Sequence, residues 1–142
     1  MTTNLRSTIQ AQLGWTWRDS TGLNIVANSN RLQMHQDLED GTDANQADAV
    51  WDAVDQSLTA GSSTVLSLDA LPRNLFGDTI TIALAKVKAI LVVNRNTSGS
   101  GYLLLGGAAG DEWHAPLGAA GNTVKIMPGA AVLLACPQSG WD

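Results

Sequence analysis

Residues 5–19 read LRSTIQAQLGWTWRD, and their side chains alternate between apolar and polar along almost the whole stretch. The residues of one parity form a largely apolar set: Leu5, Ser7, Ile9, Ala11, Leu13, Trp15 and Trp17. Successive side chains of a β-strand point to opposite faces, so this period of two predicts a half-buried strand, or two strands joined at Gly14. The stretch therefore favours a β protein.

The rest of the chain continues as short apolar segments separated by turn residues. Turns are expected at 19–22 (DSTG), 28–30 (NSN) and 59–63 (TAGSS). Strands are expected at 23–27, 31–38, 64–71, 79–94 with a bulge or bend near Lys86, and 102–108, and a closing hairpin at 123–136 turns at Pro128-Gly129. We therefore predict one all-β domain over residues 1–142, built as a β-sandwich or a jelly-roll-like barrel.

Residues 48–58 are the ambiguous part of the pattern. Their apolar positions fit a helical stripe, and Asp43 with Gln46 fits a capping box ahead of it. The valines of the same stretch also fit a strand. The pattern alone leaves both structures open.

Composition limits the functions that the chain can have. Apolar residues make up 44% of the chain and charged residues only 15%, so a surface packed against other subunits is one interpretation and a compact secreted domain is another. A net charge of −5 argues against nucleic-acid binding. No signal peptide and no membrane span are expected, so we expect synthesis in a cytoplasm. The single cysteine, Cys136, is expected to be a small buried hydrophobe.

Candidate chemical sites are few, and we predict no catalytic, cofactor or metal site. His35 and His114 lie outside any nucleophile motif. The acids Asp37, Glu39, Asp40 and Asp43 could bind calcium but lack the EF-hand spacing, which favours a solvated loop. The stretch LGGAAGDE lacks the lysine of a phosphate loop.

Tryptophan is the most informative residue type, because five accompany only one Tyr and one Phe. Exposed tryptophans can stack on sugars, but packing in a core or subunit interface is the favoured interpretation. The residues that we predict for an assembly interface are Trp15, Trp17, Trp113, Trp141, Val132 and Leu134.

Residues 45–141 carry a resemblance to small virion structural proteins of tailed bacteriophages. The matching positions are Val87, Lys88 and Asn94 in AKVKAILVVNRNT, Gly106 and Gly107 in YLLLGGA, Pro128 and Gly129 in the hairpin, and Pro137, Gly140 and Trp141 at the end. The stretch AVWDAVDQSLTAGSSTVLSLDAL is also similar to that group, where it is β rather than helix. On this resemblance we expect residues 48–58 to be β.

The resemblance implies a non-enzymatic virion component, most naturally a capsid decoration or cement protein, with a tail position as the alternative. The implied partners are copies of the chain itself, in a symmetric oligomer such as a trimer, and the major capsid protein or another virion protein. Proteins similar to this chain continue for about two strands past the GW turn. Either this chain is a shortened form or the missing strands come from a neighbour, and we expect the last hairpin to gain contacts from a neighbouring subunit or from the N-terminal segment. A carbohydrate-binding, lectin-like module or a tail adhesion protein is the competing prediction, and a small hydrolase is ranked last.

Overall fold

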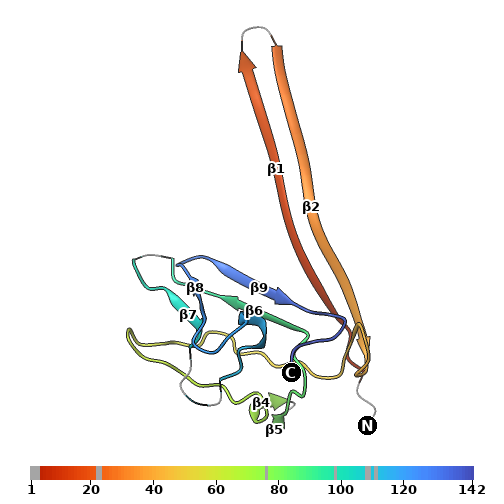
Figure 1. The fold of residues 1–142 in the computed structure, drawn as a ribbon, viewed down its shortest axis with the longest axis vertical. Helices are drawn as coiled ribbons and strands as arrows, with labels where there is room; N and C mark the ends of the chain where they lie inside the picture. Colours follow the sequence, from red (N-terminus) through yellow and green to blue (C-terminus); the bar gives the residue numbers. More distant parts are fainter. Residues whose placement is uncertain (1–3, 22–23, 76, 98, 108–109, 111) are drawn as a thin grey trace.

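The structure is a computed structural model that describes residues 4–21, 24–75, 77–97, 99–107, 110 and 112–142. Two long strands, β1 (Ser7–Thr21) and β2 (Asn24–Asp40), form an antiparallel ribbon that projects from the rest of the chain, as Figure 1 shows. We call residues 7–40 the arm and residues 41–142 the body. At about 3.3 Å per residue, strands of 15 and 17 residues reach roughly 50 Å.

The arm is longer and simpler than the sequence predicted. The two strands pair without interruption from Ser7 opposite Leu38 to Thr21 opposite Asn24. Gly14 therefore does not divide the first strand, and the turn expected at residues 28–30 is wrong because these residues lie inside β2. Residues 28–30 are exposed, so their polar side chains interrupt the apolar pattern without interrupting the strand.

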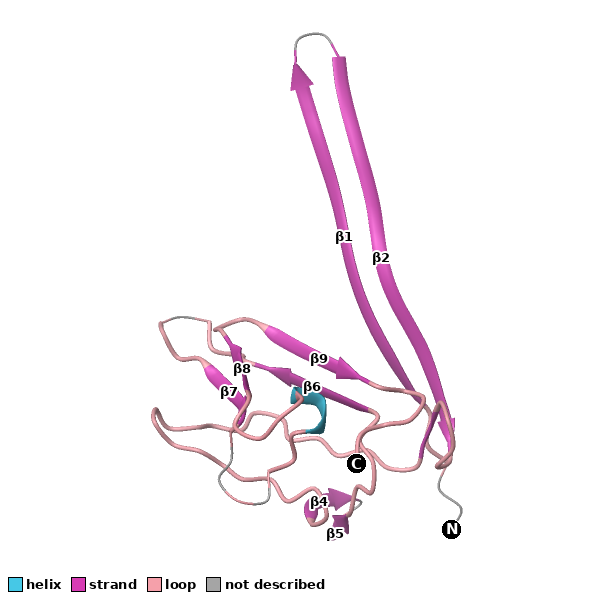
Figure 2. Cartoon of the chain, in the orientation of Figure 1, coloured by secondary structure: helices cyan, strands magenta, loops and turns pink. Residues whose placement is uncertain are grey.

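The body consists of short strands in small sheets, shown in Figure 2. Each sheet has two strands, apart from a parallel contact of two residues that extends the arm. The elements are β3 (Gln46–Ala47) beside β2, β4 (Leu71–Leu75) with β5 (Asp78–Ile82), β6 (Ala89–Val93) with β9 (Ala131–Ala135), β7 (Leu103–Gly106) with β8 (Thr123–Ile126), and a 3-10 turn, η1 (Ala115–Leu117).

The prediction of an all-β fold is confirmed. Within the described residues the sheets do not close into a barrel, and the architecture is an open set of small sheets. The break expected near Lys86 is also confirmed, since β5 ends at Ile82 and β6 begins at Ala89. Between them Val87 forms a single bridge with Trp141.

The prediction that residues 123–136 form a closing hairpin is wrong. The chain does turn at Pro128-Gly129, where the Ala130 N–H donates to the Met127 carbonyl at 3.0 Å. However, β8 pairs with β7 and β9 pairs with β6, so the turn connects two different sheets. Pairing with β6 continues into the turn, where the Asn94 N–H donates to the Ala130 carbonyl at 2.9 Å.

Residues 48–58 form neither the helix nor the strand that the sequence suggested. They form an irregular segment that is joined to β4 by hydrogen bonds from side chains. The Trp51 indole N–H donates to the Pro72 carbonyl at 2.9 Å, and Arg73 donates to the Val50 carbonyl at 2.5 Å. These side-chain contacts fix the segment without a ladder of backbone hydrogen bonds.

The base of the arm is fastened to the body through a few polar contacts. The Asn45 N–H donates to the Pro137 carbonyl at 3.0 Å. The Lys88 ammonium donates to the Asp43 carbonyl at 3.3 Å and to the Gln138 carbonyl at 2.7 Å. Lys88 thereby joins the segment that follows the arm to the C-terminal turn.

The apolar core of this single chain is small. Its buried apolar side chains, among the described residues, are Ile9, Leu38, Leu71, Val87 and Ile126. The accessible surface is 10892 Å². A compact monomer of 14.9 kDa would expose about 7,000 Å². The chain therefore exposes roughly one and a half times the expected area.

Candidate assembly surface

One face of the arm carries large apolar side chains that no described part of the chain covers. Leu13 lies opposite Leu32, Trp15 opposite Asn30 and Trp17 opposite Asn28, and cross-strand partners share a face. We define the apolar arm face as Leu13, Trp15, Trp17, Leu32 and Met34. The predicted strand parity is correct, but the predicted half-burial is wrong, since Leu13 is 65% exposed and Trp17 is 76% exposed.

The opposite face of the arm is polar, and it contains His35. The Thr8 hydroxyl donates to Asp37 Oδ1 at 2.7 Å, and His35 Nε2 lies 3.3 Å from the same oxygen. The Thr8 hydrogen bond is the main cause that lowers the pKa of Asp37. Here the carboxylate lies between the hydroxyl and the imidazole. A hydrolase triad needs the imidazole between the nucleophile and the acid, so this group does not have that arrangement.

His114 lies in the body, away from His35. Its Nδ1 is 3.0 Å from the backbone carbonyl of Glu112, and its side chain is exposed. The two histidines that the sequence offered are thus not brought together.

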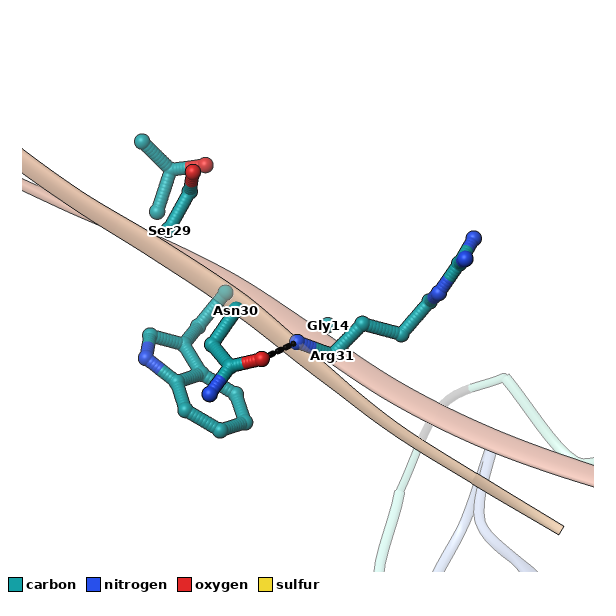
Figure 3. A pocket seen from close by; sticks show the side chains of 6 residues that line it. Gly14, Ser29, Asn30 and Arg31 are labelled. Atoms are coloured by element: carbon teal, nitrogen blue, oxygen red, sulfur yellow. Dashed lines mark hydrogen bonds between the residues drawn. The ribbon is translucent and has the colours of Figure 1, made fainter.

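A shallow, open depression lies midway along the arm (Figure 3). It is lined by Gly14, Trp15, Thr16, Ser29, Asn30 and Arg31. Asn30 Oδ1 accepts a hydrogen bond from the Arg31 backbone N–H at 2.7 Å, while the Arg31 side chain extends away from the amide. A small-molecule site normally encloses most of its ligand. This open surface is better suited to a broad partner.

The other two tryptophans of the predicted interface pack against each other in the body. The rings of Trp113 and Trp141 have centroids 6.4 Å apart and meet edge to face at 79°. The Trp113 indole N–H donates to the Asp142 carbonyl at 2.9 Å. Trp141 also exchanges two backbone hydrogen bonds with Val87. This pair holds the C-terminal residues to the body, at a different place from Trp15 and Trp17.

Val132 and Leu134 lie on β9, whose strand partner is in the same chain. Val132 lies opposite Val92 and Leu134 opposite Ile90 along the full length of β6. The expectation that the neighbour would be another subunit or the N-terminal segment is therefore wrong for this edge. The arm pairs with itself instead, and β9 keeps a second edge without a strand partner in the described part.

Asn94 is a polar centre of the body that we did not single out as such from the sequence. Its side chain is 4% exposed. The amide donates to the carbonyls of Gly101 at 2.9 Å and Ile126 at 3.1 Å, and Oδ1 accepts from the Asn96 N–H at 3.1 Å. The signal available in the sequence was an asparagine at the exact end of an apolar strand, ahead of a polar loop.

Glu112 also organises its loop with its own carboxylate. Oε1 accepts from the Gly107 N–H and Oε2 from the Gly121 N–H, both at 2.8 Å. These two bonds lower the pKa of Glu112, the Gly121 bond contributing most. Backbone N–H groups that could have met a phosphate thus bind an internal anion, in a stretch that the sequence had not favoured as a phosphate loop.

The acidic residues near the base of the arm contact different partners and do not converge on one point. Asp37 faces Thr8 and His35, and Asp40 Oδ1 accepts from the Leu5 N–H at 3.1 Å. Across the described ranges, no three His, Cys, Asp or Glu side chains gather as metal ligands would. No helix in the described part is long and apolar enough to cross a membrane.

Cys136 is half-buried rather than buried. Its sulfur lies 3.1 Å from the Ser139 hydroxyl oxygen and 3.7 Å from the Gly140 carbonyl oxygen. The contact with Ser139 is the main cause that lowers the pKa of the thiol. The residue therefore belongs to the C-terminal turn as much as to the apolar packing.

Comparisons with protein-family models, with curated proteins and with solved structures found no match to this chain. The likeness to phage virion proteins thus rests on the sequence motifs alone.

Proposed function

We propose that this chain is a non-enzymatic structural subunit that self-associates and stabilises a phage particle, as a capsid decoration or cement protein. The observation that carries the proposal is the apolar arm face, which is exposed along a ribbon of two strands. An isolated two-stranded ribbon is at best marginally stable in water. A second surface laid over this face would remove its tryptophans and leucines from water and hold the ribbon straight.

The large surface of the chain supports the same proposal. Obligate interfaces bury about 2,000–5,000 Å² or more counted over both partners, which is about 1,000–2,500 Å² or more on each subunit. The excess of this chain over a compact monomer, about 3,900 Å², is enough surface for at least one such interface. The partners would be copies of the chain, closed by symmetry so that no apolar patch is left over, and the major capsid protein or another virion protein.

The test is the mass of the purified chain by light scattering across a dilution series. We expect a discrete oligomer that survives dilution to low micromolar concentrations. A monomer at every concentration would contradict self-association of the free protein. Addition of empty phage shells, with cosedimentation as the readout, then tests the capsid partner separately.

A carbohydrate-binding or tail adhesion role is the second candidate. The observation in its favour is that each arm tryptophan has an asparagine directly across the ribbon, Trp15 with Asn30 and Trp17 with Asn28. An aromatic ring beside an amide can stack on a sugar and hydrogen-bond its hydroxyls. Binding to a glycan array that is lost in Trp17→Ala would favour this candidate.

A further inference from the structure

The arm and the loop that follows it form one unit. Two backbone hydrogen bonds of 3.3 Å pair residues 45–47 with the end of β2. Within the loop, Gly41 has a φ of +139°, and a Cβ there would overlap the Gln46 side chain. The Gln46 amide oxygen accepts a hydrogen bond from the Asp43 N–H at 3.0 Å. Residues 41–47 are thus fixed to the arm, and we call residues 7–47 the arm unit.

Two hydrogen bonds join the arm unit to the rest of the body, among the described residues. The Asn45 N–H donates to the Pro137 carbonyl at 3.0 Å. The Lys88 ammonium donates to the Asp43 carbonyl at 3.3 Å. A single hydrogen bond allows rotation about its own axis, whereas two bonds at separate points restrict that rotation. The bond from Lys88 therefore provides the second point of attachment.

The Lys88 side chain is itself held in place by the C-terminal turn. Its ammonium also donates to the Gln138 carbonyl at 2.7 Å, and its backbone carbonyl accepts from the Cys136 N–H at 2.8 Å. A Cβ on Gly140 would lie only 3.3 Å from Lys88 Cδ, so the lysine stem lies against a residue without a side chain. The ammonium is thus directed at the arm unit.

We propose that Lys88 is a latch that sets the direction in which the arm leaves the body, with the Asn45 hydrogen bond as the pivot. Ile9 and Leu38, at the base of the arm, are buried as well. Apolar contacts are not directional, so this packing keeps the base in place without fixing the angle. The inference concerns a single chain and does not depend on self-association. A fixed direction serves any closed assembly, because symmetry-related copies meet at one angle.

Pulsed electron-spin distance measurements test the latch in the full chain. Spin labels are attached through p-acetylphenylalanine at Ser20, near the arm tip, and at Thr123 on β8, which leaves Cys136 unmodified. Both labelled positions are exposed. The labelled protein is diluted with an excess of unlabelled chain, so that the measured distances lie within one chain. We expect one narrow distance distribution for the otherwise natural sequence.

Lys88→Met keeps an unbranched stem and removes the ammonium. Because the arm is a lever of roughly 50 Å, a rotation of about 10° at its base moves its tip by roughly 9 Å. We therefore expect Lys88→Met to broaden the distribution by several ångström or more. Lys86→Met is the matched control, because it removes the same charge where the ammonium contacts Asp142, at 3.2 Å, and not the arm unit. It should leave the distribution narrow, and equal broadening in both variants would overturn the proposal.

A second pair of labels, at Thr81 on β5 and Thr123, reports on the body alone. The latch predicts that this pair stays narrow in Lys88→Met while the pair at Ser20 and Thr123 broadens. If both pairs broaden, Lys88 holds the body together and is not a latch for the arm. If neither broadens, the apolar packing at the arm base fixes the direction instead. A broad distribution from Ser20 to Thr123 in the natural sequence would show that the direction is not fixed. Each of these three results overturns the proposal.

Discussion

Asn94 joins three separate segments of the body through one buried side chain. Asn94→Ala removes two donated bonds and one accepted bond, and it takes a donor from the buried carbonyl of Ile126 and from the part-buried carbonyl of Gly101. Such losses cost about 1–3 kcal/mol each where no water replaces them, so we expect the free energy of unfolding to fall by at least about 1 kcal/mol. Urea titration followed by tryptophan fluorescence measures this.

The control for Asn94 is Thr97→Ala, an exposed change in the loop that follows. It should alter the free energy of unfolding by less than about 0.5 kcal/mol. If both variants unfold at the same urea concentration, the hydrogen bonds of Asn94 do not contribute to stability as argued.

Glu112 makes the stability of its loop in the body depend on pH, and the direction of that dependence follows from its pKa shift. Its folded pKa lies below its ordinary value of 4.5, chiefly through the Gly121 and Gly107 N–H bonds. A lowered pKa means that the contribution is fully present above pH 4.5 and is lost as the pH falls through the folded pKa. We expect the protection factors of the Gly107 and Gly121 amides, which compare the observed exchange rate with the intrinsic rate at each pH, to fall in that acid range.

The variant Glu112→Gln separates this effect from general acid denaturation. Its neutral amide offers one acceptor oxygen where the carboxylate offers two. At least one of the two glycine amides should therefore lose its acceptor and have a lower protection factor than in the natural chain at neutral pH, with little further change in that factor on acidification. Unchanged protection at neutral pH would show that the loop is held by other contacts.

Among the elements, the arm and the C-terminal turn use tryptophan in opposite ways. Trp15 and Trp17 are exposed on a ribbon, whereas Trp113 and Trp141 pack on each other. We expect Trp15→Ala and Trp17→Ala to weaken assembly by about tenfold or more, because interface tryptophans are often worth about 2 kcal/mol, and to leave the fold of the body intact. Light scattering and circular dichroism together measure this.

The opposite result is expected for the C-terminal pair. Trp141→Ala removes the edge-to-face contact with Trp113 and should lower the unfolding temperature of the body before it changes assembly. If both arm variants assemble normally, the arm tryptophans are not anchors, and the apolar arm face is not the main interface.

The whole chain has a small core and a large surface, so its stability is expected to depend on association. A partner that binds only the folded chain raises stability by mass action. The unfolding temperature should therefore rise with protein concentration over a hundredfold range, as measured by differential scanning fluorimetry. An unfolding temperature that does not change with concentration would indicate that the folded monomer is stable by itself.

Local features of this protein follow from the sequence alone. The alternation from Leu5 to Trp17 predicted a strand and its two faces, and the phase change near Lys86 predicted a break. The turn at Pro128-Gly129 was predicted in the same way. These features depend on neighbouring residues, because side-chain alternation, proline and glycine act within a few positions of the chain.

The tertiary structure determined the features that depend on distant residues. It left the apolar arm face in solvent, gave β9 the partner β6 in place of β8, and held residues 48–58 by side chains from β4. A period of two shows that a strand has two different faces, but not what covers the apolar one. Which segment covers the apolar face depends on how all the strands of the chain pair with one another. The alternation within one strand does not contain that information.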